Sequence, residues 1–183
     1  MMIEFTPYDF IIGVAILAIL LVILWRQKKS FSFLFFFSIF WIYLLYVVSV
    51  VVFPFLIIKI SNGEIFRPSI NLIPFYFGSC GELPNACYMN IIGNILITMP
   101  LGFGINFIAR VRAKDFLWLA FVVGFAIEGA QLIISLIFRS SFRSIDINDV
   151  ILNAIGVLLG YGCFRIFAWI YLIIAQQLEI KHM

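Results

Sequence analysis

The residues best suited to chemistry are acids and amides inside apolar segments. Glu128 and Gln131 lie in one such segment, and Asn90 and Asn94 lie in another. Charged side chains at the centre of a bilayer cost about 2.5–3.5 kcal/mol each on insertion scales, so they normally face other helices or a water-filled cavity. Their positions are therefore the strongest functional evidence in this sequence.

A third polar group opens the last apolar segment. Asp146, Asp149 and Asn153 are spaced by three and four residues, which places them on one helix face. Arg143 precedes them and is able to contact phosphate or carboxylate. The structural alternative is a capped helix start, in which both aspartates favour the positive end of the helix dipole and Arg143 is their salt-bridge partner.

These side chains suit binding, and three functions stay open. The candidate ligand-binding residues are Asn90, Asn94, Glu128, Gln131, Arg143, Asp146, Asp149 and Asn153. In a metal-dependent enzyme, Glu128, Asp146 and Asp149 would hold a divalent cation through oxygen ligands, and the cation would polarise a phosphoryl group or activate water. In a small transporter, Glu128 would carry a proton. Plain hydrogen bonding between helices is the structural alternative for Asn90, Asn94 and Glu128.

The composition indicates where these residues must sit. The chain has 183 residues, of which 64% are hydrophobic and only 11% are charged, with a mean hydropathy of +1.16. A soluble domain needs more charge to cover its surface. The basic residues form short clusters between apolar runs, which is typical of topology signals and argues against nucleic-acid binding. We expect one membrane domain over residues 1–183.

The apolar runs predict an all-α polytopic membrane bundle of about five transmembrane helices, since a helix needs about 20 apolar residues to cross the hydrocarbon. Pro54 interrupts the second run, and Pro100 is expected to kink the third. The fifth is longer than a bilayer requires, so its end should lie along the interface or project into the cytoplasm. The expected spans are Tyr8–Trp25, Phe31–Ile58, Tyr88–Ala109, Phe116–Phe138 and Asp146–Ala175.

The basic residues predict the orientation. The loops after the first and third spans carry six Lys and Arg residues, and those after the second and fourth carry four. Because cytoplasmic loops are richer in Lys and Arg, the N-terminus is expected outside and the C-terminus inside. The outer ends of the last three spans then place Asn94 and Asn153 about 10 Å deep and Glu128 about 15 Å deep, at 1.5 Å per residue. The polar groups should line one cavity that opens outward.

The longest segment outside the spans, Asn62–Ala86, is rich in glycine and proline and contains a short apolar island, Ile70–Phe77. The island either dips into the membrane beside the helices or rests on the lipid headgroups. Cys80 and Cys87 follow it; a disulfide is possible if that side is oxidising, although two free thiols are slightly favoured. Deeper in the fifth span, Gly156 and Gly160 are four residues apart and should let another helix approach closely.

These motifs resemble the VanZ-like family over residues 71–161. The resemblance rests on Asn71–Phe75, Asn90–Phe103, Glu128–Gln131 and Arg143–Gly156. The last contains the specific pattern Arg-x-x-Asp-x-x-Asp-x-x-x-Asn-x-x-Gly, whereas the other pieces alone are weak. Thr98 departs from the family, which usually has an aromatic or aliphatic residue there.

The resemblance implies a multi-pass protein of the bacterial cell membrane with a role in low-level resistance to teicoplanin, but it supplies no mechanism. We expect membrane lipids as partners, together with a lipid-linked cell-wall precursor or a lipoglycopeptide. Both are amphiphiles that fit a pocket open to lipid and water. Whether the chain binds, transports or modifies such a molecule stays open.

Overall fold

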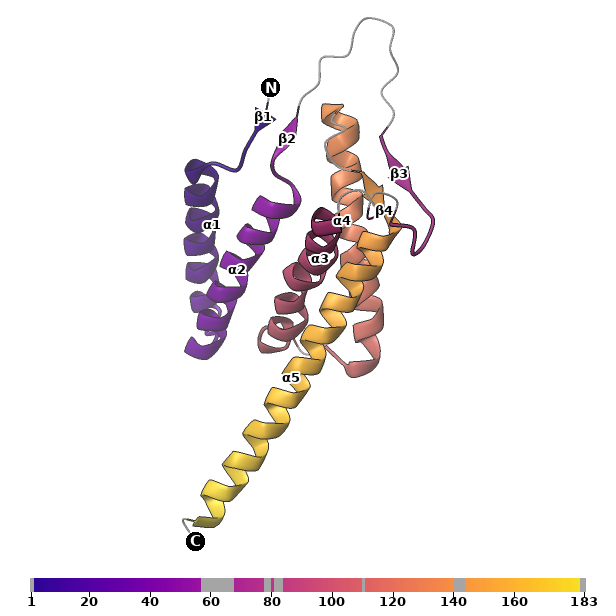
Figure 1. Cartoon of the computed structure of the whole chain (residues 1–183). Helices are drawn as coiled ribbons and strands as arrows, with labels where there is room; N and C mark the ends of the chain where they lie inside the picture. Colours follow the sequence, from indigo (N-terminus) through magenta and orange to yellow (C-terminus); the bar gives the residue numbers. More distant parts are fainter. Residues whose placement is uncertain are drawn as a thin grey trace, which may run out of the picture.

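The computed structural model describes residues 2–56, 68–77, 80, 84–109, 111–139 and 144–181. In this part of the chain, five helices are long and apolar enough to cross a membrane. Figure 1 shows them as a bundle, with the strands gathered at one end, where α2 and α4 end and α3 and α5 begin. We call this the loop end. The expected all-α membrane bundle is thereby confirmed.

The first two helices form a pair whose limits follow from local sequence. Helix α1 (Pro7–Arg26) begins with a capping box in which the Thr6 and Asp9 side chains satisfy each other's backbone N–H groups. Helix α2 spans Phe31–Val51. The expected helix to Ile58 is wrong as far as residue 56, because Pro54 has no N–H and its ring would clash with the helical backbone. Residues 57 and 58 lie outside the described residues.

Short strands follow α2 and frame the loop end. Strand β2 (Phe55–Leu56) pairs antiparallel with β1 (Met2–Ile3). Further along the chain, a disulfide joins Cys80 to Cys87. The sequence slightly favoured free thiols at these two positions, and the structure corrects this. The bond ties the start of the third helix to the loop before it.

Helix α3 spans Pro84–Gly104, passes through Pro100 and continues as a short 3-10 helix, η2 (Ile105–Phe107). A second 3-10 turn, η3 (Ala113–Asp115), leads into α4 (Phe116–Phe138), whose limits equal those predicted. Helix α5 runs from Ile147 to Lys181 and is about 50 Å long at 1.5 Å per residue. Its C-terminal half continues straight beyond the other helices (Figure 1).

Helices α3 and α5 run in the same direction and pack through glycines. A side-chain carbon added at Gly160 would overlap the carbonyl oxygen of Met99, and one added at Gly102 would overlap that of Val157. A side-chain carbon added at Gly156 would likewise overlap the Thr98 hydroxyl and the carbonyl oxygen of Ile95. The close approach predicted from Gly156 and Gly160 is confirmed, and the two backbones touch along this glycine seam.

Helix α4 completes a three-helix core with α3 and α5. The rings of Phe116 and Tyr161 stack 3.8 Å apart, and Ala120 and Val157 are fully buried beside them. At Gly124, a side-chain carbon would lie 2.5 Å from the carbonyl oxygen of Val150. This tight core fixes where polar side chains near the loop end can point.

Helix α2 contacts the core at several points, one of which is a hydrogen bond in mid-span. The Tyr43 hydroxyl donates to the carbonyl oxygen of Ile97 at 2.5 Å. That carbonyl lies three residues before Pro100, and a proline disturbs the hydrogen bonding of the turn that precedes it. On its other side, α2 binds α1, because the Trp41 indole donates to the carbonyl oxygen of Gly13 at 2.9 Å.

Candidate functional site

The start of α5 is clamped to the loop that precedes α3. Strand β3 (Ile70–Asn71) pairs in parallel with β4 (Ile145–Asp146). The Asn71 amide donates to both carboxylate oxygens of Asp146, at 3.0 and 3.1 Å. Asp146 also accepts from the backbone N–H of Asn148 at 2.8 Å, so it caps α5. The structural alternative for Asp146, a helix cap, is therefore what the structure shows.

Asn148 completes the clamp, and the spacing argument missed it. Its side chain is 2% exposed. It accepts from the backbone N–H of Phe75 at 2.6 Å and donates to the carbonyl oxygen of Tyr76 at 2.8 Å. The signal that could have found it is its place between the two aspartates in the first turn of α5. The clamp thus consists of Asn71, Asp146 and Asn148.

Glu128 belongs to the same region, at a different level from the one expected. Its carboxylate accepts from the backbone N–H of Asp146 at 3.1 Å, and its side chain is buried. The sequence placed Glu128 deep and Asp146 at the rim, on the assumption that the helices end at one level. That assumption is wrong, because α4 extends past the start of α5 at the loop end (Figure 1).

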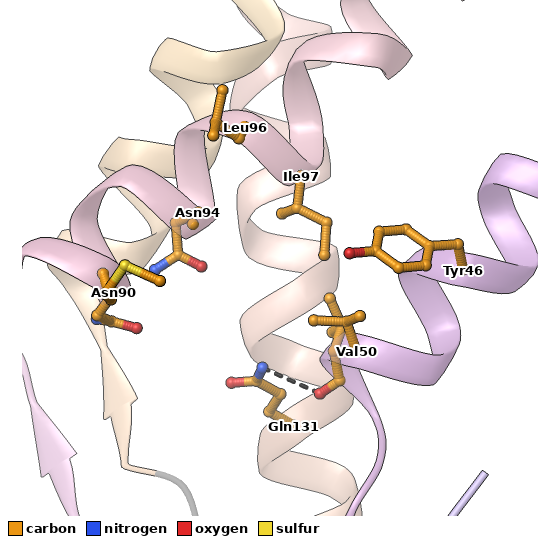
Figure 2. Close-up of a pocket in the computed structure, with 10 residues that line it drawn as sticks. Tyr46, Val50, Asn90, Asn94, Leu96, Ile97 and Gln131 are labelled. Carbon is orange, nitrogen blue, oxygen red and sulfur yellow. Dashed lines mark hydrogen bonds between the residues drawn. The ribbon is translucent and has the colours of Figure 1, made fainter. Parts of the chain in front are cut away.

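A pocket of about 390 Å³ opens between α2, α3 and α4. Figure 2 shows the amides of Asn90 and Asn94 on one side of it and Gln131 on α4 below them. Gln131 donates to the carbonyl oxygen of Val51 at 3.2 Å, which ties α4 to the end of α2. The remaining lining residues are Tyr46, Val50, Val51, Met89, Gly93, Leu96 and Ile97. The described lining is therefore uncharged, with amides facing apolar side chains.

Polar side chains link this pocket to α5. The Asn90 amide donates to a carboxylate oxygen of Asp149 at 3.1 Å. About two turns further along α3, the Thr98 hydroxyl lies 3.0 Å from the carbonyl oxygen of Asn94 and 2.9 Å from that of Asn153. Asn153 is fully buried. The pocket wall and the α3–α5 interface are thus one continuous polar region.

The predicted site residues divide into two groups. Three of them line the pocket: Asn90, Asn94 and Gln131. Four of them lie behind it or in the clamp region and do not line it: Glu128, Asp146, Asp149 and Asn153. Arg143 lies outside the described residues. The pocket residues that α2 contributes were missed, because spacing within one segment does not show which helix packs beside it.

The predicted metal site is not assembled. Among the described residues, no three carboxylate, thiol or imidazole side chains come close enough to hold a metal ion. Asp146 turns toward Asn71 and its own helix start, and Glu128 accepts from the Asp146 backbone. In the described structure these carboxylates lie in separate contacts that join loop and helices, since Asp149 accepts from Asn90.

Comparison with known proteins places this arrangement in a family. The family model VanZ/LLP1 matches residues 40–168. The chain belongs to the VanZ/LLP1 family. Within this VanZ/LLP1 protein, the matched range runs from the middle of α2 to the middle of α5, so it contains both the clamp and the pocket. Neither the curated proteins nor the solved structures yield a match.

Family membership and the five long apolar helices together define a multi-pass membrane protein. Large apolar side chains are exposed along the helices, which suits contact with lipid. The VanZ/LLP1 protein thus presents an apolar outer surface to the bilayer and keeps a small amide-lined pocket near the loop end.

Proposed function

We propose that this VanZ/LLP1 protein of the bacterial cell membrane binds the polar part of an envelope amphiphile in the pocket between α2, α3 and α4. The ligand would be a lipid-linked cell-wall precursor or a lipoglycopeptide of the teicoplanin type. Binding would confer or modulate resistance to that class of antibiotic. The pocket would open to the outer side of the membrane, as the distribution of basic residues predicts.

The lining of the pocket is the observation that carries this proposal. The amides of Asn90, Asn94 and Gln131 share the lining with apolar side chains such as Val50 and Leu96. A polar head and an apolar chain need these two kinds of surface side by side, and binding pockets combine them in this way. The volume of about 390 Å³ suits a head group or a sugar, not a whole antibiotic.

Blocking the pocket tests the proposal. Gly93 lines it, and a side-chain carbon added there would meet nothing within 4 Å. Gly93→Trp should fill the pocket without disturbing the helices. In a susceptible bacterium that expresses the protein, this variant should lower the inhibitory concentration of teicoplanin to that of cells without the protein. The inhibitory concentration of a glycopeptide that lacks a lipid tail should be the same in all of these cells.

Gly129→Trp is the matched control. Gly129 is also a helical glycine with nothing within 4 Å of an added side-chain carbon, but it lies outside the pocket lining. Cells that express Gly129→Trp should be as resistant as cells that express the parent protein at the same level in the membrane. Full resistance in Gly93→Trp would overturn the proposal. Alanine at Glu128 or Asp149 should also lower resistance, because these residues hold the helices that form the pocket.

A further inference from the structure

Asn94 in the wall of the pocket faces a second asparagine, Asn153, which lies behind the wall on α5. Asn90 on α3 donates to Asp149 on α5 at 3.1 Å, so these faces of the two helices meet. The helices run in the same direction, and Asn94 and Asn153 each lie one turn further along. Residues four apart share a helix face, so Asn94 and Asn153 also face the α3–α5 interface. The Thr98 hydroxyl, within 3.0 Å of both their carbonyl oxygens, confirms that they are neighbours.

Three of the four polar atoms in these two amides are buried without partners among the described residues. The amide nitrogen of Asn94, and both the nitrogen and the oxygen of the Asn153 amide, have no hydrogen bond to any residue that the structure describes. Buried polar groups in native proteins are almost always satisfied, and an orphaned group requires an explanation. Two unpartnered donors and an unpartnered acceptor at the back of a pocket match a ligand group that both accepts and donates.

Charge limits which ligand groups fit. The described residues that line the pocket are uncharged. The side chain that Asn90 contacts, Asp149, is an acid. An anionic phosphate would find no cationic side chain among the described lining residues, whereas a hydroxyl or an amide needs only the amides that are present. Neutral amides also pair well with groups that carry both a donor and an acceptor.

We infer that the pocket selects an uncharged hydrogen-bonding head group, namely sugar hydroxyls or an N-acyl amide. Asn94 and Asn153 determine this specificity. Asn94 lines the pocket and makes the first contact, and Asn153 lies behind it on α5. The inference rests on the proposed function and names the class of head group that the same site takes.

Competition between amphiphiles that share the same alkyl chain but differ in head group tests the inference. The full-length protein in phosphatidylcholine nanodiscs is labelled with dodecyl glucoside that carries a diazirine, and labelled residues are mapped by mass spectrometry. Dodecyl glucoside should compete for labelling around Asn94, and dodecyl phosphate should be at least tenfold weaker. Dodecyl phosphate that competes as well as the glucoside, or equal competition by dodecyl trimethylammonium, would overturn the inference.

Variants separate this inference from the proposed function. Asn94→Leu and Asn153→Leu should each weaken glucoside competition about tenfold, which corresponds to the net value of one hydrogen bond. Asn106→Leu is the matched control, because Asn106 bonds only weakly to Gly102, at 3.4 Å, near the opposite end of α3. Thermal unfolding confirms that each variant folds. Saturable labelling with no head-group preference would refute the inference and leave the proposed function standing. Labelling that never saturates would refute both.

Discussion

The amide of Asn71 donates to both carboxylate oxygens of Asp146, which lies 75 residues further along the chain. This contact fastens a loop to the first turn of α5, and it also orients a carboxylate that caps the helix. Because Asp146 is in addition bonded through its backbone to Glu128, the loop, α4 and α5 meet at one residue. The clamp therefore sets the geometry of the loop end behind the pocket.

Removing the clamp should destabilise the protein measurably. Asn71→Leu loses a charge-assisted hydrogen bond, worth about 1.5–3 kcal/mol. Asp146→Ala loses the same bond and also the helix cap, which is worth about 0.5–2 kcal/mol more. Asn71→Leu also loses the hydrogen bonds that Asn71 makes with Tyr76 and Ile73. Unfolding in detergent should therefore show a loss of stability of similar size in both variants, and amide exchange in residues 70–77 should accelerate in both. Leu72→Ala is the control, because Leu72 is 71% exposed and should shift stability little.

The glycine seam gives a prediction with a control on the same helix. Gly160→Leu cannot keep α3 and α5 in contact, because its side chain would overlap the Met99 carbonyl. It should lower the melting temperature strongly or prevent folding. Gly162→Leu should change little or stabilise slightly, since nothing lies within 4 Å of an added side-chain carbon there and leucine favours the helix. Equal melting temperatures for the two variants would show that α3 and α5 do not pack this way.

The turn at residues 70–77 is expected to sit in the lipid. Its backbone is bonded by protein groups, since Asn148 contacts Phe75 and Tyr76, and the N–H of Ile73 donates to Asn71 at 3.1 Å. Non-helical backbone is tolerated at membrane depth only when protein satisfies it in this way. The exposed side chains of Leu72, Ile73, Phe75 and Tyr76 are large and apolar. These observations favour a dip into the membrane over a loop on the headgroups.

Depth measurement decides between those two positions. A nitroxide attached at Leu72→Cys should relax faster with oxygen than with a water-soluble nickel reagent, as expected below the headgroups. The same label at Tyr8→Cys, at the start of α1, provides the interfacial reference. A nickel response at residue 72 that matches the reference would place the turn on the surface. Because Cys80 and Cys87 are joined, Cys163 is the only native thiol to replace beforehand.

How much of the fold could be predicted depends on whether each feature is local. The limits of α4 follow from a mostly apolar run between charged residues at 115 and 139. The end of α2 was misplaced because apolar residues continue past Pro54, and hydropathy outweighed the backbone chemistry of proline. The level of Glu128 was wrong because helix ends need not lie at one depth, which no periodicity within a helix can indicate.

The candidate site was partly predictable for the same reason. Asn90, Asn94 and Gln131 stood out because amides are rare in apolar runs, and all three line the pocket. Tyr46 and Val50 were missed, since α2 carries no polar pattern that marks its pairing with α3. Asn148 was missed because it does not share the helix face of Asp146 and Asp149. It is nevertheless buried, and both its amide oxygen and its amide nitrogen are hydrogen-bonded.

The orientation predicted from the basic residues can be checked by thiol labelling. A disulfide between Cys80 and Cys87 persists only where the surroundings are oxidising, which supports a loop end on the outer side. Thr6→Cys should react with a membrane-impermeant maleimide on intact cells. Lys114→Cys, in the turn between α3 and α4, should react only after permeabilisation. The reverse pattern would place the pocket on the cytoplasmic side and remove its access to extracellular antibiotic.

Two buried asparagines on α5 should respond in opposite ways to the same substitution. Asn148→Leu breaks two hydrogen bonds that hold residues 75 and 76, so it should cost several kcal/mol, at about 1–3 kcal/mol for each group left unsatisfied. Asn153→Leu removes an amide that has no partner among the described residues, so it should raise the free energy of unfolding by about 1–2 kcal/mol. Denaturant titration in the same detergent measures both. A large loss of stability in Asn153→Leu would mean that its amide is satisfied within the protein and is not held ready for a ligand. Stabilisation accompanied by weaker binding is the pattern expected of a residue retained for function at the expense of the fold.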